Sequence, residues 1–271
     1  MKIKLSLCGL CFLLAFYGKA QNYDFPSLST SAIGLSGASD TTCWSVFSNP
    51  SGISSLKTSV AGGGYYRAFM TDALSARSAF VVLPSKWIHA GGGYVQYGNS
   101  LFSVRSFSLT LARRLSPRLQ MGCRLKYVLR SISGAEDQGT PVWDAGFRYG
   151  ISDGLWMAVM ARNPARSSIE SEFNEQPIPS YLAVACDVRL SPSFFLTADV
   201  AHHASLSQQT YGLGLSAVIS GYATLRGSVS ARPVVFSVGA TLNPGPFMIS
   251  VATGHHDRLG MSPSAGITYH F

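Results

Sequence analysis

The chain has 271 residues, of which 46% are hydrophobic and only 13% are charged, and its formal net charge at pH 7 is +8. Soluble domains usually carry about 25% charged residues, and no run of lysines and arginines is present of the kind that binds nucleic acid. Beyond residue 20 no apolar run approaches the ~18 residues that a membrane-spanning helix needs. These features exclude a nucleic-acid-binding protein and favour a membrane β-barrel, in which the apolar residues alternate with polar ones.

The first 20 residues have the pattern of a secretory signal peptide. Lys2 and Lys4 precede an apolar stretch over 5–17, and small residues stand at Gly18 and Ala20. We therefore expect a signal peptide over 1–20, cleaved after Ala20, and export of the remaining chain. That chain keeps three cysteines, an odd number that argues against a disulfide framework.

Residues 21–57 do not alternate and are rich in Ser, Thr, Gly and Asn. A barrel of many strands leaves room that side chains alone do not fill, so this segment can enter the lumen, with Trp44 and Phe47 as anchors. The alternative is a disordered linker before the first strand. We predict the plug.

From residue 58 onward, apolar and polar residues alternate almost without interruption, as in strands with one face against lipid. The pattern predicts a barrel over 58–271 with about fourteen strands, an even number as in single-chain bacterial barrels. The expected strands cover 58–68, 75–83, 87–97, 101–114, 118–132, 141–151, 154–162, 179–190, 193–203, 209–219, 221–232, 233–243, 246–254 and 259–271.

If the apolar faces of these strands meet lipid, their charged residues point into the lumen. Both signs of charge occur there, so that the charges can pair in a medium of low dielectric constant. The predicted lumenal charges are Arg124, Lys126, Asp144, Arg148, Asp187, Arg189, Asp199 and Arg226.

Most connections between the strands are short turns, such as those at 116–117, 153–154 and 191–192. Two connectors, 133–140 and 163–178, are longer and more polar. Bacterial barrels place tight turns on the periplasmic side and longer loops outside, so we expect both long connectors on the outside.

The last thirteen residues alternate strictly: every odd position from Leu259 to Phe271 is apolar and every even one is small or polar. A strand that ends on Phe271 with Tyr269 two places before it resembles the closing strand of bacterial outer-membrane barrels. In those proteins the terminal aromatic is part of the signal read by the barrel-assembly machinery. The alternative is an edge strand of a soluble β domain.

The segment before the first strand resembles the N-terminal segment of PorV-type and FadL-type barrels. Their loose pattern is G-x-x-G-A, an aromatic residue, and then N-P-A-G-L. The residues that match it are Gly34, Gly37, Ala38, Trp44, Asn49, Pro50 and Gly52, with Ser51 and Ile53 in place of Ala and Leu. The resemblance implies a fourteen-stranded outer-membrane barrel with a partial plug, similar to the PorV-like proteins of bacteria that carry type IX secretion.

A search for catalytic and metal-binding motifs found none that is complete in the exported chain. The only clustered histidines are His202–His203 and His255–His256, followed by Asp257. Adjacent residues of a strand point to opposite faces and do not easily chelate one ion. We therefore expect no enzyme, no cofactor and no metal.

These observations leave three functions. The first, implied by the resemblance, is a PorV-like barrel that assists protein export or surface presentation, with lipid of the bacterial outer membrane, the barrel-assembly machinery and secretion-complex proteins as partners. The second is a FadL-like channel for hydrophobic or small solutes, which a predicted polar and charged lumen disfavours. The third, a barrel enzyme, lacks a site. We predict the first, with the FadL-like channel as the alternative.

Overall fold

The computed structural model describes residues 35–169, 175–204 and 208–271. The predicted signal peptide and Gly34 of the plug motif lie outside these ranges. Within them, no helix has the length and apolar character needed to cross a bilayer, which does not bear on proteins that cross with strands.

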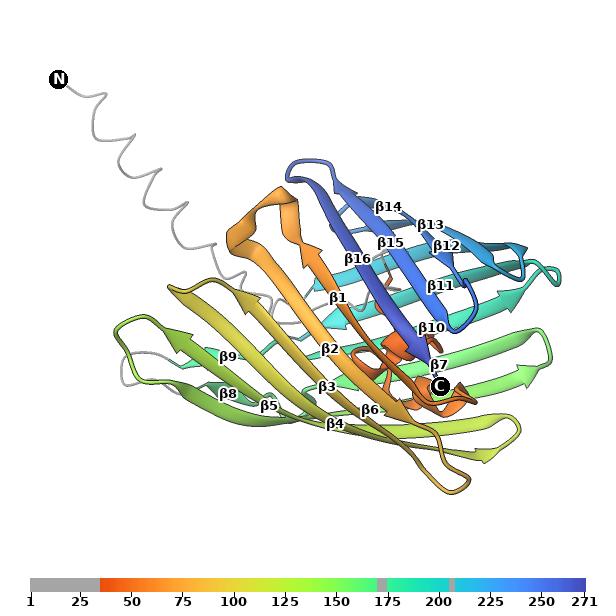
Figure 1. Cartoon of the computed structure of the whole chain (residues 1–271), viewed down its shortest axis with the longest axis horizontal. Coiled ribbons are helices and arrows are strands. Elements are labelled where there is room, and N and C mark those ends of the chain that lie inside the picture. Colours follow the sequence, from red (N-terminus) through yellow and green to blue (C-terminus); the bar gives the residue numbers. More distant parts are fainter. Residues whose placement is uncertain (1–34, 170–174, 205–207) are drawn as a thin grey trace.

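Fourteen antiparallel strands form a closed barrel (Figure 1). Around the barrel each strand pairs with its neighbour in the chain, and β10 follows β7. The ring closes where residues 60–66 of β1 pair with residues 264–270 of β16. The strands are β1 (Val60–Arg67), β2 (Ser75–Leu83), β3 (His89–Gly98), β4 (Phe102–Ser116), β5 (Leu119–Ile132), β6 (Gln138–Ser152), β7 (Leu155–Arg162), β10 (Tyr181–Arg189), β11 (Phe194–His203), β12 (Gln208–Ser220), β13 (Ala223–Ala231), β14 (Val235–Leu242), β15 (Phe247–His256) and β16 (Gly260–His270).

The predicted barrel of fourteen strands is confirmed, with ends that differ by a few residues. The sequence did not predict β8 (Ser168–Ile169) and β9 (Gln176–Pro177), which pair as a separate two-stranded sheet. This small sheet lies in the connection between β7 and β10, which was expected to be a plain polar loop.

The wall has an apolar outer face and a small or polar inner face. In β16, Met261, Ile267 and Tyr269 are exposed, whereas Ser262 and Thr268 are buried. Most of the other barrel strands also expose large apolar side chains on the outside. Such a belt matches lipid chains, and closure leaves no strand edge with unpaired backbone groups.

The two ends of the barrel differ. At one end, which we call the terminal end, β1 begins, β16 ends and the connections are the turns predicted to be short. At the other, the loop end, lie the 133–137 connection and the long β7–β10 connection. The two connectors predicted to share a side therefore do share one end, and its position outside the membrane stays a prediction. The antiparallel order of the strands fixes this arrangement.

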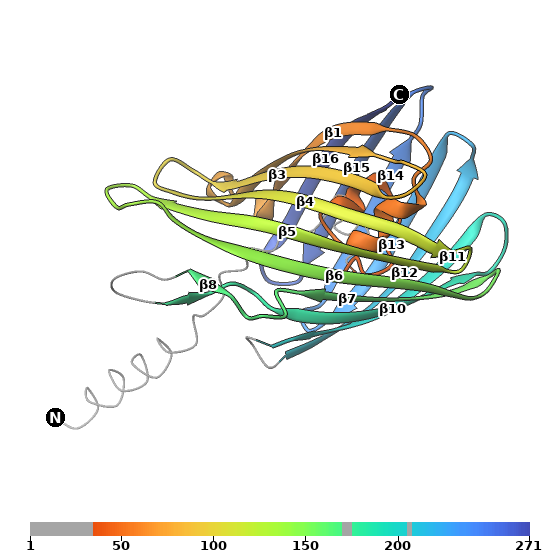
Figure 2. The same cartoon turned by 90° about the horizontal axis from the view of Figure 1, so that it is seen from below.

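Residues 35–57, which we call the inner segment, lie inside the barrel between β1 and the opposite wall (Figure 2). They contain two short 3-10 helices, η1 (Cys43–Val46) and η2 (Pro50–Ser55), both almost wholly buried. This part of the segment is therefore folded within the barrel. Whether it closes the pore stays a prediction.

Candidate functional site

Apolar side chains of η1 and η2 hold the inner segment against one side of the wall. Trp44 and Phe47 both stack edge-on against Phe80 of β2, with ring centroids 4.9 and 5.7 Å apart. Val46 and Ile53 complete the same buried cluster. The two aromatic residues expected to be anchors thus pack on the wall.

The Asn49-Pro50-Ser51-Gly52 motif shapes the turn that begins η2. The Asn49 side chain caps the helix by accepting hydrogen bonds from the backbone N–H (3.0 Å) and hydroxyl (2.7 Å) of Ser51, and its amide donates to the Ala38 carbonyl at 2.5 Å. Pro50 stands at the first helical position, where no N–H is needed. A Cβ at Gly52 would come within 2.1 Å of the Asp40 carbonyl oxygen. Hydrogen bonding or steric fit therefore explains why each residue of the motif stands at its position.

Glycines of the wall make room for this turn. A Cβ at Gly146 of β6 would lie 1.9 Å from Oδ1 of Asn49, and one at Gly122 of β5 would lie 2.5 Å from the Pro50 carbonyl carbon. Gly91 and Gly93 of β3 face Val46 and Phe47 in the same way. The inner segment thus packs closely against the wall at positions where a residue with a Cβ atom would crowd it.

Two arginines of the wall bind the carbonyls at the end of η1. Nη1 of Arg124 donates to the Val46 oxygen at 2.7 Å, and Nη2 of Arg162 donates to the Phe47 oxygen at 2.9 Å. On β11, which lies two strands beyond β7 around the barrel, Asp199 accepts a hydrogen bond from the backbone N–H of Ser36 at 2.6 Å. Charged donors satisfy helix-end carbonyls well, so these contacts hold the inner segment against β5, β7 and β11.

Asp144 is the centre of the lumenal charges and has no exposed side-chain surface. Its Oδ2 accepts from Nε of Arg124 at 2.8 Å and lies 3.0 Å from Nζ of Lys126. Arg162 is its backbone partner on β7. This buried carboxylate is therefore in direct contact with Arg124 and Lys126, and Arg162 is its neighbour across the sheet.

The other carboxylate oxygen of Asp144 holds the loop end. It accepts from the backbone N–H of Asn163 at 3.1 Å, and the buried Asn163 side chain donates in turn to the carbonyls of Ser167 and Ile178. Ile178 and Ile169 pack on lumen-facing valines of β4, β5 and β6. Through Ile169 and Ile178, the described parts of the β7–β10 connection therefore pack against the inner face of the wall.

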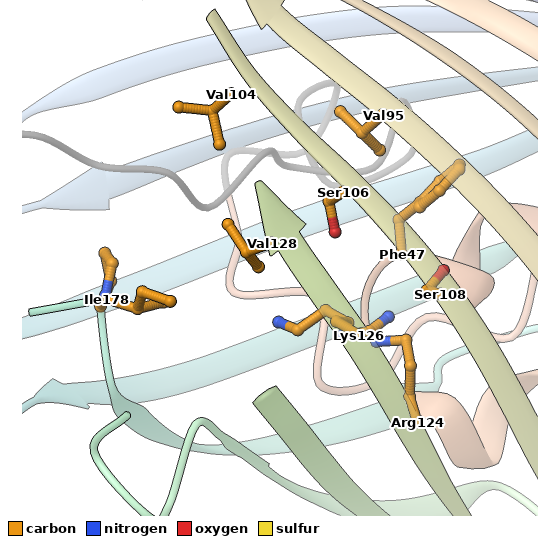
Figure 3. Close-up of a pocket in the computed structure, with 10 residues that line it drawn as sticks. Phe47, Val95, Val104, Ser106, Ser108, Arg124, Lys126, Val128 and Ile178 are labelled. Carbon is orange, nitrogen blue, oxygen red and sulfur yellow. The ribbon is translucent and has the colours of Figure 1, made fainter. Parts of the chain in front are cut away.

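A pocket lies between this connection and the inner segment (Figure 3). Its cavity volume is about 50 Å³, within about 600 Å³ of space between its walls that includes open solvent. Its walls are mainly apolar, and Arg124 and Lys126 lie at the edge nearest Phe47. The lining residues are Phe47, Val95, Val104, Ser106, Ser108, Arg124, Lys126, Val128, Ile178 and Pro179. Such a surface can hold a small apolar molecule, with or without an acidic group.

This pocket corrects the expectation of a lumen that is polar throughout. Val104 and Val128 occupy the inner face of their strands, alternating with outward-facing apolar residues. In the sequence they are recognisable only as apolar residues at positions where the alternation otherwise has polar ones. Their packing with Ile178, which lies 50 residues beyond Val128 and 74 beyond Val104, could not be inferred from the alternation.

The other predicted lumenal charges occupy separate places. Arg148 lies 3.6 Å from Asp187, which accepts a hydrogen bond from Thr197 at 2.7 Å. Arg226 donates to Thr241 at 2.7 Å. Arg189, at the terminal end, is exposed and lies over the ring of Phe195. Only Arg124, Lys126 and Asp144 of the predicted set come together at the pocket or against it.

Of the predicted motif residues in the inner segment, Gly37 has a φ of +80° in a turn, and Ala38 and Trp44 are buried. At the chain end, Tyr269 and Phe271 stack with centroids 6.0 Å apart, and the Phe271 N–H donates to the Ser59 carbonyl at 2.9 Å. Their role as an assembly signal stays a prediction.

Of the three cysteines that the structure describes, Cys43 is the buried one, in the inner segment. Burial raises the pKa of the Cys43 thiol to about 12, so the thiol is protonated and unreactive near neutral pH. Over the described ranges, no group of three or more His, Cys, Asp or Glu side chains is placed to hold a metal ion.

Solved structures of other proteins have a similar fold. No protein-family model and no curated protein matches the sequence. A solved structure of a Pseudomonas aeruginosa FadL homologue has a TM-score of 0.70 at 10% identity, covering 93% of this chain and 100% of that one. The toluene transporters TodX of Pseudomonas putida (TM-score 0.71, 12% identity, 92% and 98% covered) and TbuX of Ralstonia pickettii (0.68, 11%, 92% and 98%) are similarly close. The chain therefore has the fold of FadL-type transporters, whereas none of these structures is of PorV type.

Proposed function

We propose that this chain is a non-enzymatic barrel of the bacterial outer membrane that carries small hydrophobic solutes through its lumen. The observation that carries the proposal is the apolar pocket between the inner segment and the β7–β10 connection, because a solute that crosses the barrel meets both. The transporters with the same fold support it, since two of them are described as toluene transporters.

The lining suggests the class of solute. Valines from three strands and Phe47 suit an aromatic or short aliphatic body, while Arg124 and Lys126 at the pocket edge can donate hydrogen bonds to a single acidic group. A strongly polar or multiply hydroxylated solute would lose hydrogen bonds to water on the valine walls without replacing them. We therefore expect aromatic hydrocarbons and monocarboxylic amphiphiles to bind better than sugars.

Narrowing the pocket tests the proposal. Ser106 lies on the inner face of β4 between Val95 and Val128, so Ser106→Phe would fill the pocket. Its control is Ser228→Phe, at an inward-facing serine of β13 on another part of the wall. We expect Ser106→Phe to weaken binding of toluene and of a medium-chain carboxylate at least tenfold, and the control to change it less than twofold.

Binding is measured by titration calorimetry on purified barrels, and uptake into proteoliposomes is measured in parallel. A wild-type barrel that binds neither solute, or a Ser106→Phe barrel that binds both as well as wild type, would refute the lumenal pathway. Folding of each variant is checked by its heat-dependent mobility on gels.

The PorV-like export role implied by the sequence resemblance stays a second prediction. It needs a protein partner on the barrel surface rather than a passage for solute through the lumen. Comparing solute uptake with protein export in a strain lacking the gene separates the two roles.

A further inference from the structure

The outer wall carries a row of polar residues at one height near the loop end. Arg77 of β2 pairs with Gln96 of β3, and Gln96 pairs with Arg105 of β4. All three point outward, in phase with the exposed apolar residues of their strands. Because neighbouring strands lie about 4.8 Å apart, the two arginines stand roughly 10 Å apart with the glutamine between them.

On the terminal-end side of this row, the same strands carry first a row of aromatic residues and then a row of leucines, as at a membrane interface. Two residues further toward the terminal end, Tyr94, Phe107 and Tyr127 are successive partners on β3, β4 and β5, and the first two rings are 5.0 Å apart. The next layer down contains Leu109 and Leu125, both more than half exposed. Aromatic belts mark the boundary between lipid chains and headgroups, so the arginine row lies at headgroup depth.

The row forms one wall of a polar hollow with about 970 Å³ of space, counting its open side. Guanidinium, amide and hydroxyl groups dominate its lining. The lining residues are Ser75, Arg77, Tyr94, Gln96, Gly98, Asn99, Ser100, Ser103 and Arg105. Tyr94 belongs to the aromatic row below, and the other side chains of the lining are polar or charged, with their hydrogen-bond donors grouped together.

The charge of the hollow is positive. Arg105 is held by Asp137 at 2.8 Å and by the Ser131 hydroxyl at 2.6 Å, which fixes its direction. Arg77 is exposed and forms no ion pair among the residues that the structure describes. Two guanidinium groups thus face a single carboxylate, which leaves a net attraction for an anion at the membrane surface.

We propose that this hollow binds the phosphorylated headgroup of a glycolipid in the leaflet at the loop end. Arg77 and Arg105 would hold phosphate, because a planar guanidinium forms paired hydrogen bonds with it. The serine, asparagine and glutamine side chains would hydrogen-bond sugar hydroxyls. The acyl chains would lie along Leu109 and Leu125.

The lining favours a glycolipid over a glycerophospholipid, since the latter offers a phosphate but few further hydroxyls for the five serine, asparagine and glutamine side chains. A protein partner is disfavoured because the site lies directly above the aromatic row, where lipid covers the wall. The proposal needs only a barrel in a membrane and does not depend on the lumenal pathway.

Native mass spectrometry of the detergent-purified barrel tests the site. The probes are a diphosphorylated glucosamine-disaccharide lipid, its dephosphorylated form, and phosphatidylglycerol. Arg77→Gln and Arg105→Gln each remove one charge. The matched control is Arg113→Gln, at an exposed arginine on the same face of β4 near the terminal end.

We expect one phosphorylated glycolipid bound per wild-type barrel. The dissociation constant should rise about tenfold for Arg77→Gln and for Arg105→Gln, as expected for loss of one charged hydrogen-bonding partner, and should stay unchanged for Arg113→Gln. Equal binding of the dephosphorylated lipid would overturn the role of the arginines. Equal binding of phosphatidylglycerol would overturn the glycolipid assignment, and an equal loss in Arg113→Gln would show a non-specific charge effect.

Discussion

At the scale of the residue, Asp144 joins three parts of the molecule. One of its oxygens binds Arg124, which in turn binds the Val46 carbonyl of the inner segment, and the other binds Asn163 of the β7–β10 connection. A fully buried carboxylate is costly unless its partners offset the loss of water. Its surroundings therefore join the inner segment, the wall and the loop end into one network.

Replacing Asp144 by asparagine should destabilise the barrel by about 3–5 kcal/mol, because Arg124 and Lys126 would remain buried without their counter-charge. Asp72→Asn is the control, since its ion pair with Arg67 is short (2.8 Å) but the Asp72 side chain is 83% exposed. Such surface pairs contribute less than about 1 kcal/mol. Urea unfolding of the two variants in lipid vesicles measures both values, and similar losses would contradict the central place given to Asp144.

At the scale of the element, the inner segment is held by shape as much as by charge. Gly146→Ala would force a methyl group against Oδ1 of Asn49, a contact of 1.9 Å, and so displace the turn that starts η2. Overpacking of this kind costs about 1–3 kcal/mol. We expect the barrel to stay folded while Trp44 and Phe47 become open to cleavage by chymotrypsin.

Gly227→Ala is the matched control, because a Cβ at that wall position meets nothing closer than 3.9 Å. It should leave the inner segment as resistant to chymotrypsin as in wild type. If Gly146→Ala were equally resistant, the fit between wall glycines and the Asn49 turn would not hold the segment in place.

The same element shows what could be predicted from the sequence. Period-two alternation predicts the fourteen strands and the inward direction of Arg124 and Asp144, because each strand has only two faces. The glycines at 122 and 146 look like any small residue of the inner face. Their fit to Pro50 and Asn49 depends on which turn enters the barrel and at what height along the wall. No local sequence pattern predicts that position.

The β7–β10 connection was predicted as a polar loop because β8 and β9 have two residues each, too few to show alternation. Its burial depends on Ile169 and Ile178 meeting Val104, Val128 and Val142 of distant strands. The pocket, formed where this connection faces Phe47, could therefore not be predicted from the sequence. The same holds for the apolar part of the lumen, which makes solute passage the better-supported function.

At the scale of the whole molecule, the two proposed functions use different surfaces. Solute transport needs the lumen, in which the inner segment and the β7–β10 connection both contribute to the lining of the pocket. Export assistance needs an outer or loop-end surface that a partner protein can reach. A substitution that fills the pocket and leaves the wall intact should therefore abolish one function and spare the other.

We expect a strain lacking this gene to take up toluene or a medium-chain carboxylate more slowly than its parent, with secreted and surface proteins unchanged. Wild-type gene should restore uptake, whereas a Ser106→Phe gene should not. The reverse result, in which exported proteins stall in the periplasm and the Ser106→Phe gene restores them, would refute solute transport as the main role and establish the PorV-like one. Because Ser106 faces the pocket and not the surface, the same variant distinguishes the two outcomes in a single strain background.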